Sequence, residues 1–262
     1  MKITTLIENT SLSPEFACEH GLSLFIETER HTILFDAGQS GLFADNAEKL
    51  GIDLNRVDIA FLSHGHYDHS GGLMRFLELN DHAPIYMNEN AFAACHNAEN
   101  KYIGVNLALR DSGRLRLTGD EAVIDEELTL LTCNRHKRIH PSSGQGLTVL
   151  TDRGLVPDDF THEHYLVIRE GGRKIVVSGC SHKGVLNIAE WLRPDVLVGG
   201  FHFMKLDPVS DRSALFASAE TLLSRPTEYY TGHCTGCPQY DILKERMGDR
   251  LHYLAAGSVY TI

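Results

Sequence analysis

The run His64-Gly65-His66-Tyr67-Asp68-His69 places three imidazoles and one carboxylate within six residues. It directly follows Val57–Leu62, a short apolar segment typical of a buried strand covered on both faces. In an extended or tightly turned loop, residues i and i+2 can point the same way, so His64 and His66 can meet one ion. Asp68 and His69 would then turn toward a second ion. Because such a set rarely arises in a solvated loop, the run indicates a metal site.

Outward from this run, strand-like and helix-like segments alternate along the chain. We predict strands at Lys2–Ile7, Leu22–Glu27, Thr32–Phe35, Val57–Leu62, Pro84–Met87, Tyr165–Arg169, Lys174–Val177, Val196–Val198 and Val259–Ile262. We predict helices at Leu42–Leu50, Leu73–Leu79, Val185–Trp191, Ser213–Leu223 and Tyr240–Met247. From about Glu89 to His140 the hydrophobic pattern is less regular. A helix is expected there over Glu89–His96, with strands near Leu115–Leu117 and Leu128–Leu131. The recurring order of strand, loop and helix predicts an α/β layered fold, in one domain over residues 1–262.

The chain of 262 residues has a net charge of −11 and no clusters of Lys and Arg, so we expect no nucleic-acid partner. An acidic protein can still bind a phosphorylated small molecule through a bound cation. No apolar stretch has the roughly 18 residues that a membrane span needs, and the N-terminus lacks a secretory signal. We therefore expect a cytoplasmic protein without a membrane partner, and the oligomeric state is left open. The six cysteines are expected to be reduced thiols, whereas the 15 histidines suggest metal.

His64, His66, Asp68 and His69 resemble the His-x-His-x-Asp-His hallmark of the metallo-β-lactamase superfamily, residue by residue. The preceding Leu34-Phe35-Asp36-Ala37-Gly38 resembles the first motif of the same superfamily. The resemblance extends over most of the chain and implies an αββα sandwich, with two mixed sheets and outer helices. It also implies one or two divalent metal ions at the ends of the strands, with Zn expected first and Mn or Fe as alternatives.

Four further stretches resemble one subgroup of that superfamily: Glu19–Ser23, Gly179–Val185, Gly199–His202 and Gly232–Gly236. Its members are commonly named dihydropterin-ribofuranosylaminobenzene phosphate synthases, or simply metal-dependent hydrolases of the β-lactamase superfamily II. The resemblance assigns His64 and His66 to a first metal. It assigns Asp68, His69 and His233 to a second, with Asp68 also able to orient the attacking water as a general base.

The third superfamily motif departs from the usual pattern. There is no His-Thr-x-Gly before the hairpin Tyr165–Val177 and no Gly-Asp after it, and Cys180 stands where a bridging Asp is expected. We expect His182 to be a metal ligand that takes over the missing histidine. His162 and His164 could supply it instead, although a surface pair at the hairpin entry is the simpler interpretation. Cys180 is either a ligand or a small buried thiol.

Other residues near these motifs have supporting roles in this interpretation. His202 is expected to contact substrate as a catalytic residue, although a core histidine would fit equally well. Asp36 is expected to hold the metal loop from behind rather than to bind metal. His20 either lines the site or closes a turn. For Cys234 and Cys237 we favour packing over a zinc site, because one C-x-x-C pair supplies too few ligands.

The function we predict is metal-dependent hydrolysis by a metal-activated water, on a phosphoester or other anionic small molecule. No Gly-x-Ser-x-Gly run is present, which agrees with a reaction that needs no protein nucleophile. The alternatives are a pterin-related transferase or synthase, as the subgroup's name implies, and an iron-dependent oxidative enzyme on the same scaffold. A metal-binding or regulatory module without turnover is a further alternative.

Overall fold

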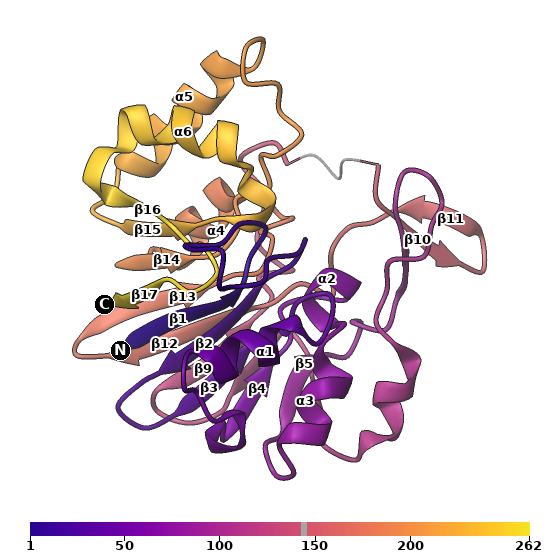
Figure 1. Cartoon of the computed structure of the whole chain (residues 1–262). Coiled ribbons are helices and arrows are strands. Elements are labelled where there is room, and N and C mark those ends of the chain that lie inside the picture. Colours follow the sequence, from indigo (N-terminus) through magenta and orange to yellow (C-terminus); the bar gives the residue numbers. More distant parts are fainter. Residues whose placement is uncertain (143–145) are drawn as a thin grey trace.

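The computed structural model describes residues 1–142 and 146–262, and in these ranges two seven-stranded mixed sheets face each other. The first sheet has the order β17-β1-β2-β3-β4-β5-β7, with bounds Val259–Thr261, Lys2–Ile7, Ser23–Glu27, Thr32–Phe35, Ile59–Phe61, Ile85–Asn88 and Leu115–Thr118. The second has the order β16-β15-β14-β13-β12-β9-β8, with bounds Leu251–Tyr253, Glu228–Thr231, Val196–Val198, Arg173–Val177, Tyr165–Glu170, Leu128–Leu131 and Glu121–Val123. A small third sheet, β11-β10-β6, consists of Gly154–Pro157, Thr148–Thr151 and Ala94–His96 and projects from the body (Figure 1).

Helices cover the outer faces of both large sheets (Figure 1). The first sheet carries α1 (Leu42–Lys49), α2 (Tyr67–Ser70), α3 (Leu73–Leu79), η1 (Leu54–Arg56) and η2 (Leu107–Ser112). The second carries α4 (Val185–Leu192), α5 (Arg212–Leu223), α6 (Cys237–Met247), η3 (His233–Thr235) and η4 (Gly248–Arg250). The inner strand faces form one apolar cluster between the sheets, and each outer face forms another with its helices. This is the αββα layering, and each layer is explained by burial of one apolar face.

The direction of the strands determines at which edge of each sheet the connecting loops lie. In the first sheet β3, β4, β5 and β7 are parallel, and in the second β13, β14, β15 and β16 are parallel. The carboxyl ends of parallel strands meet at one edge of a sheet, which is where ligands bind in open α/β sheets. The histidine-bearing loops follow β4, β13, β14 and β15, so this edge is where the candidate site lies.

Most predicted elements are present within a residue or two of their expected bounds, but one prediction was wrong. Glu89–His96 is not a helix: Asn88 Oδ1 accepts the backbone N–H of Asn90 at 2.9 Å in a turn, and Ala94–His96 then pairs with β10 as a strand. The strands β10 and β11 of the small third sheet were not predicted. Among the helices of the described ranges, none is long and apolar enough to cross a membrane.

Candidate metal centre

Side chains from both sheets converge at the carboxyl ends of the parallel strands. His64 and His66 follow β4, and Asp68 and His69 lie on the single turn α2. The remaining side chains of the site lie in the loops after β13, β14 and β15, and they are Cys180, His182, His202 and His233. Four loop residues here have left-handed backbone with φ between 50° and 59°: Asp36, Ser181, His202 and His233. Such strain in residues other than Gly costs roughly 1–3 kcal/mol each and is concentrated at functional sites.

A first donor set consists of His64, His66 and His182, whose ligand atoms all lie within 4.8 Å of one another. Nε2 of His64 and Nε2 of His182 are 3.2 Å apart, and all three residues are buried. Burial, together with the neighbouring histidines, lowers the pKa of His64 and His182 well below the ordinary value. Burial likewise lowers the pKa of His66 to about 3. The set is therefore neutral at pH 7, which is the form of imidazole that binds metal.

A second donor set adjoins the first and consists of Asp68, His69, Cys180 and His233. Nε2 of His69 lies 3.2 Å from Sγ of Cys180 and 3.2 Å from Nε2 of His233. Oδ2 of Asp68 lies 3.4 Å from Nε2 of His233. Burial, with Cys234 and Asp68 nearby, raises the pKa of the Cys180 thiol, which would become a thiolate on binding a cation. Carboxylate, imidazole and thiolate together suit a borderline-soft divalent ion such as zinc.

The hydrogen bonds fix which nitrogen of each imidazole is available. His69 Nδ1 donates to Asp36 Oδ2 at 2.6 Å, and His233 Nδ1 donates to Asn9 Oδ1 at 2.8 Å. The Ser63 hydroxyl donates to Asp36 at 2.7 Å, so its oxygen accepts from His64 Nδ1 at 2.8 Å. In the neutral form of all three histidines, the proton is held on Nδ1 and the Nε2 lone pair faces the donor set. These residues therefore fit a divalent ion, because outward Nδ1–H bonds are how proteins orient metal-binding histidines.

The ligand loops are held in place by buried carboxylates from other segments. Each carboxylate accepts backbone N–H groups of one loop, which ties that loop to another segment of the chain. The pairs are Asp36 with Ser63, Glu163 with His182 and Lys183, and Glu8 with His233. The Glu163 carboxylate also accepts from the Tyr165 hydroxyl at 2.7 Å.

Asp68 is the carboxylate that faces the opening of the site. Burial would raise its pKa, but His69, His20 and His233 outweigh that effect and hold the pKa well below its usual value. Asn9 Nδ2 donates to His20 Nδ1 at 3.3 Å, so His20 Nε2 carries a proton that it donates to Asp68 Oδ2 at 3.3 Å. His20 thus orients Asp68 and does not serve as a ligand.

A cleft of about 200 Å³ opens over the donor sets. Asp68, His182 and His233 of the donor sets line it, and so do His202, Lys205 and Asn97. The His202 ring lies 4.2 Å from the His182 ring. Burial and the positive charge of Lys205 lower the pKa of His202 to about 4, so this imidazole is neutral at pH 7.

The sequence model of one protein family matches residues 17–233, which span both donor sets and most of the chain. The chain belongs to the metallo-beta-lactamase superfamily. This confirms the resemblance and the αββα fold that were predicted from the sequence.

Three relatives of this superfamily member are similar over nearly their whole length. The crystal structure of Tm1679, described as a metal-dependent hydrolase of the beta-lactamase superfamily, has a TM-score of 0.82 and 28% identity, and covers 100% of this chain and 99% of that one. A Methanocaldococcus jannaschii protein named 7,8-dihydropterin-6-methyl-4-(beta-D-ribofuranosyl)-aminobenzene-5'-phosphate synthase is 28% identical, over 99% of this chain and 96% of its own. An uncharacterized protein of the same organism is 27% identical, over 89% of this chain and 90% of its own.

The structure brings all the predicted ligands together: His64, His66, Asp68, His69, His182 and His233 lie in the two donor sets. The Cys180 thiol is buried, and its Sγ atom also lies in the second donor set. The expectation of a surface pair at His162 and His164 was wrong, because both side chains are buried. Cys234 packs against the Cys180 loop, whereas the exposed Cys237 contacts the Tyr253 hydroxyl.

Sequence reasoning missed Glu8, Asn9 and Glu163, which support the donors without belonging to any ligand motif. The signal available for Glu8 and Glu163 was a carboxylate within two residues of the end of a buried strand. Such a residue must be paired if its strand is buried.

Proposed function

We propose that this chain is a metal-dependent hydrolase with two divalent ions, zinc being the first candidate, that acts on a phosphoester or other anionic small molecule. The observation that carries the proposal is the pair of adjoining donor sets, with the rings of His64 and His69 only 4.3 Å apart. Ions held there would supply Lewis-acid activation of water and stabilise negative charge that develops on the substrate. The set His64, His66 and His182 would hold one ion, and Asp68, His69, Cys180 and His233 the other.

Three side chains that line the cleft have separate roles in this proposal. Asp68 is ionised at neutral pH and lines the cleft, so it can accept a hydrogen bond from water and orient it. His202 is neutral and can donate one N–H to an oxygen of the substrate. Lys205 brings a positive charge to the cleft, which favours an anionic substrate. The net charge of the whole chain, −11, does not oppose this, because recognition depends on the local electrostatic field.

The test is hydrolysis of chromogenic phosphomonoesters and phosphodiesters by protein that has been stripped of metal and reloaded with Zn, Mn or Fe. We expect His66→Ala to lose bound metal and to lower kcat/KM by more than about 100-fold. His82→Ala is the matched control, because that histidine side chain is 52% exposed and pairs with Asp81 away from the donor sets. Full turnover by the His66 variant would rule out the proposed metal centre as the source of activity.

A second candidate is synthesis of a pterin-containing phosphate, which is favoured by the relative that carries a synthase name and aligns over 99% of this chain. Incubation with a dihydropterin that carries a leaving group such as diphosphate on its 6-methyl carbon, together with a phosphorylated ribosyl-aminobenzene, distinguishes the candidates when mass spectrometry follows the joined product and the released diphosphate. A condensed product without ester hydrolysis supports the synthase. Iron as the metal that restores activity, with consumption of dioxygen, supports an oxidative enzyme instead.

A further inference from the structure

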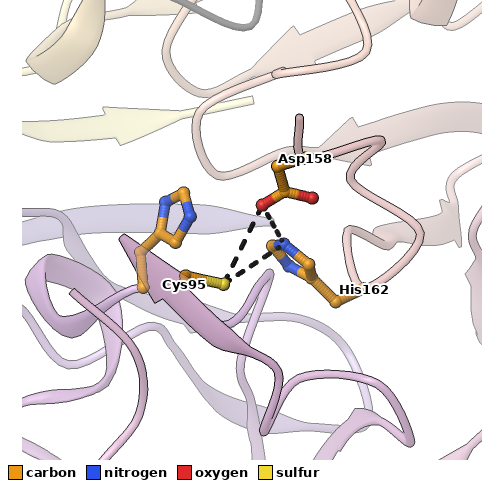
Figure 2. A group of neighbouring side chains, drawn as sticks. Cys95, Asp158 and His162 are labelled. Carbon is orange, nitrogen blue, oxygen red and sulfur yellow. Dashed lines mark hydrogen bonds and ion pairs between the residues drawn. The ribbon is translucent and has the colours of Figure 1, made fainter. Parts of the chain in front are cut away.

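A third group of buried side chains lies beside the first donor set. Cys95 from β6, Asp158 and His162 point toward one another in Figure 2, and His66 lies near enough for all four ligand atoms to fall within 4.8 Å. Sγ of Cys95 is 3.8 Å from Asp158 Oδ2 and 3.8 Å from His162 Nε2, and the last two atoms are 3.1 Å apart. By spacing and residue type alone, this group resembles another metal site.

The proton on His162 argues against that interpretation. The backbone N–H of Gly65 donates to Nδ1 of His162 at 3.1 Å, so this nitrogen must present its lone pair to Gly65. A neutral imidazole with an accepting Nδ1 carries its proton on Nε2, which donates it to Asp158 Oδ2. His64, His69 and His233 have the opposite arrangement, with Nδ1 protonated and Nε2 facing the donors. His162 therefore has no lone pair to offer an ion among Cys95 and Asp158.

We propose that Asp158 and His162 are positioning residues that fix the peptide of Gly65, and through it the separation of the two metal-binding histidines on either side. This proposal rests on the proposed role of His64 and His66. The buried Asp158 carboxylate polarises the His162 ring through Nε2, which strengthens Nδ1 as an acceptor for the Gly65 N–H. Asp158 is itself anchored, because its Oδ1 accepts the N–H of Phe160 at 2.7 Å.

Gly65 also packs closely against backbone. A Cβ added at Gly65 would lie 2.2 Å from the carbonyl oxygen of Ala91, so the loop cannot come closer to Ala91 and no larger residue fits without a shift. Gly65 therefore has two fixed contacts, with Ala91 and with His162, and it lies in sequence between the two ligands. Cys95 fills space beside the pair, and burial next to Asp158 raises the pKa of its thiol to about 12, so it adds no charge.

The first test reads the His162 proton directly and needs no substrate. In a 15N-histidine NMR spectrum of the metal-loaded protein, the His162 signals are assigned by their loss in His162→Gln. We expect an unprotonated Nδ1 and a protonated Nε2, both unchanged between metal-free and metal-loaded protein. A protonated Nδ1, or an Nε2 that loses its proton when metal is added, would show that His162 is a ligand and overturn the proposal.

The second test compares variants by metal affinity and by the spectrum of the cobalt-loaded protein. His162→Gln keeps an amide oxygen for Gly65 and an amide N–H for Asp158 but is a poor metal ligand, so we expect affinity near that of the unaltered protein. His162→Leu removes both bonds and is expected to weaken metal binding by roughly 10–100-fold. Equal losses in both variants would contradict a positioning role.

Cys95→Ser is the control within the cluster. Its hydroxyl can still donate to Asp158, and we expect the metal content and the thiolate-to-cobalt absorption to stay unchanged. A loss of one bound ion, or of part of that absorption, would identify Cys95 as a ligand and refute the proposal. Absence of hydrolase activity in the unaltered protein would instead count against the proposed function and leave these readouts intact.

Discussion

Asp36 contacts two parts of the candidate centre at once. Its Oδ2 accepts from His69 Nδ1 and from the Ser63 hydroxyl, and its Oδ1 accepts the Ser63 N–H at 2.7 Å. Asp36→Asn keeps one side-chain oxygen as an acceptor and replaces the other by an amide N–H₂ group. That group faces a donor that the carboxylate accepted from, so at least one of the three hydrogen bonds is lost. We expect the second ion to bind roughly 10–100-fold more weakly, as measured by competition with a chromophoric chelator. Asp45→Asn, at an exposed position of α1, is the control, and an equal effect there would refute the assigned role.

Single residues also show what the sequence could and could not reveal about the site. His64, His66, Asp68 and His69 were predicted because ligands packed into one short run form a recognisable pattern. Asn9 could not be predicted, because its role depends on a contact with His233 across 224 positions of sequence. A hydrogen bond between distant segments leaves no local pattern, so supporting residues become visible only when the fold has brought them together.

Helices and strands were predicted correctly where burial gives the sequence a clear hydrophobic pattern. β1, β4 and β13 are largely buried strands rich in Ile, Leu, Val and Phe, and they were found close to their predicted bounds. β10 and β11 form a projecting hairpin in which none of the eight residues is fully buried. Without a buried face there is no strong hydrophobic period, which explains why this pair was not foreseen.

The loop between β13 and α4 depends on a carboxylate that precedes β12. Glu163 accepts the N–H groups of His182 at 2.6 Å and Lys183 at 3.1 Å, and the buried Lys183 ammonium donates to the Glu163 carbonyl at 2.8 Å. Glu163→Gln removes the negative charge and directs an amide N–H₂ at one of these donors. We expect the free energy of unfolding to fall by about 2–4 kcal/mol in urea denaturation of metal-free protein.

Glu78→Gln is the matched control for this change, because Glu78 is 64% exposed and pairs only at the surface with Arg75. We expect its urea midpoint to equal that of the unaltered protein. Similar midpoints for the Glu163 and Glu78 variants would show that the loop does not depend on Glu163.

For the molecule as a whole, the two donor sets connect the two sheets. His64, His66, Asp68 and His69 come from the first sheet, and His182, Cys180 and His233 come from the second. Metal bound between them stabilises the folded state by mass action, by about 2.7 kcal/mol when the free ion is at 100 times its Kd. We expect a chelator to lower Tm in calorimetry and added Zn²⁺ to restore it. His66→Ala should show a smaller recovery, and identical recovery in both proteins would contradict an ion shared by the sheets.

The same buried histidines make the stability of the metal-free protein depend on pH. Burial lowers the pKa of His66 to about 3 and those of His202 and His233 to about 4, against about 6.5 in the unfolded chain. Between these values the unfolded state binds more protons than the folded state, so stability is present above pH 6.5 and is lost as the pH falls toward 4.

His69 acts in the opposite direction. Its burial is outweighed by Asp36 and Asp68, so its pKa is raised and its contribution is lost as the pH rises. The other histidines of the two donor sets have lowered pKa values, and His69 is the one histidine of these sets whose pKa is raised. We therefore expect Tm of chelator-treated protein to be lower at pH 5 than at pH 7. His202→Gln removes one titrating group without removing a predicted ligand, and should reduce that difference in Tm. A Tm that rises on acidification would contradict neutral, buried imidazoles at the centre of the molecule.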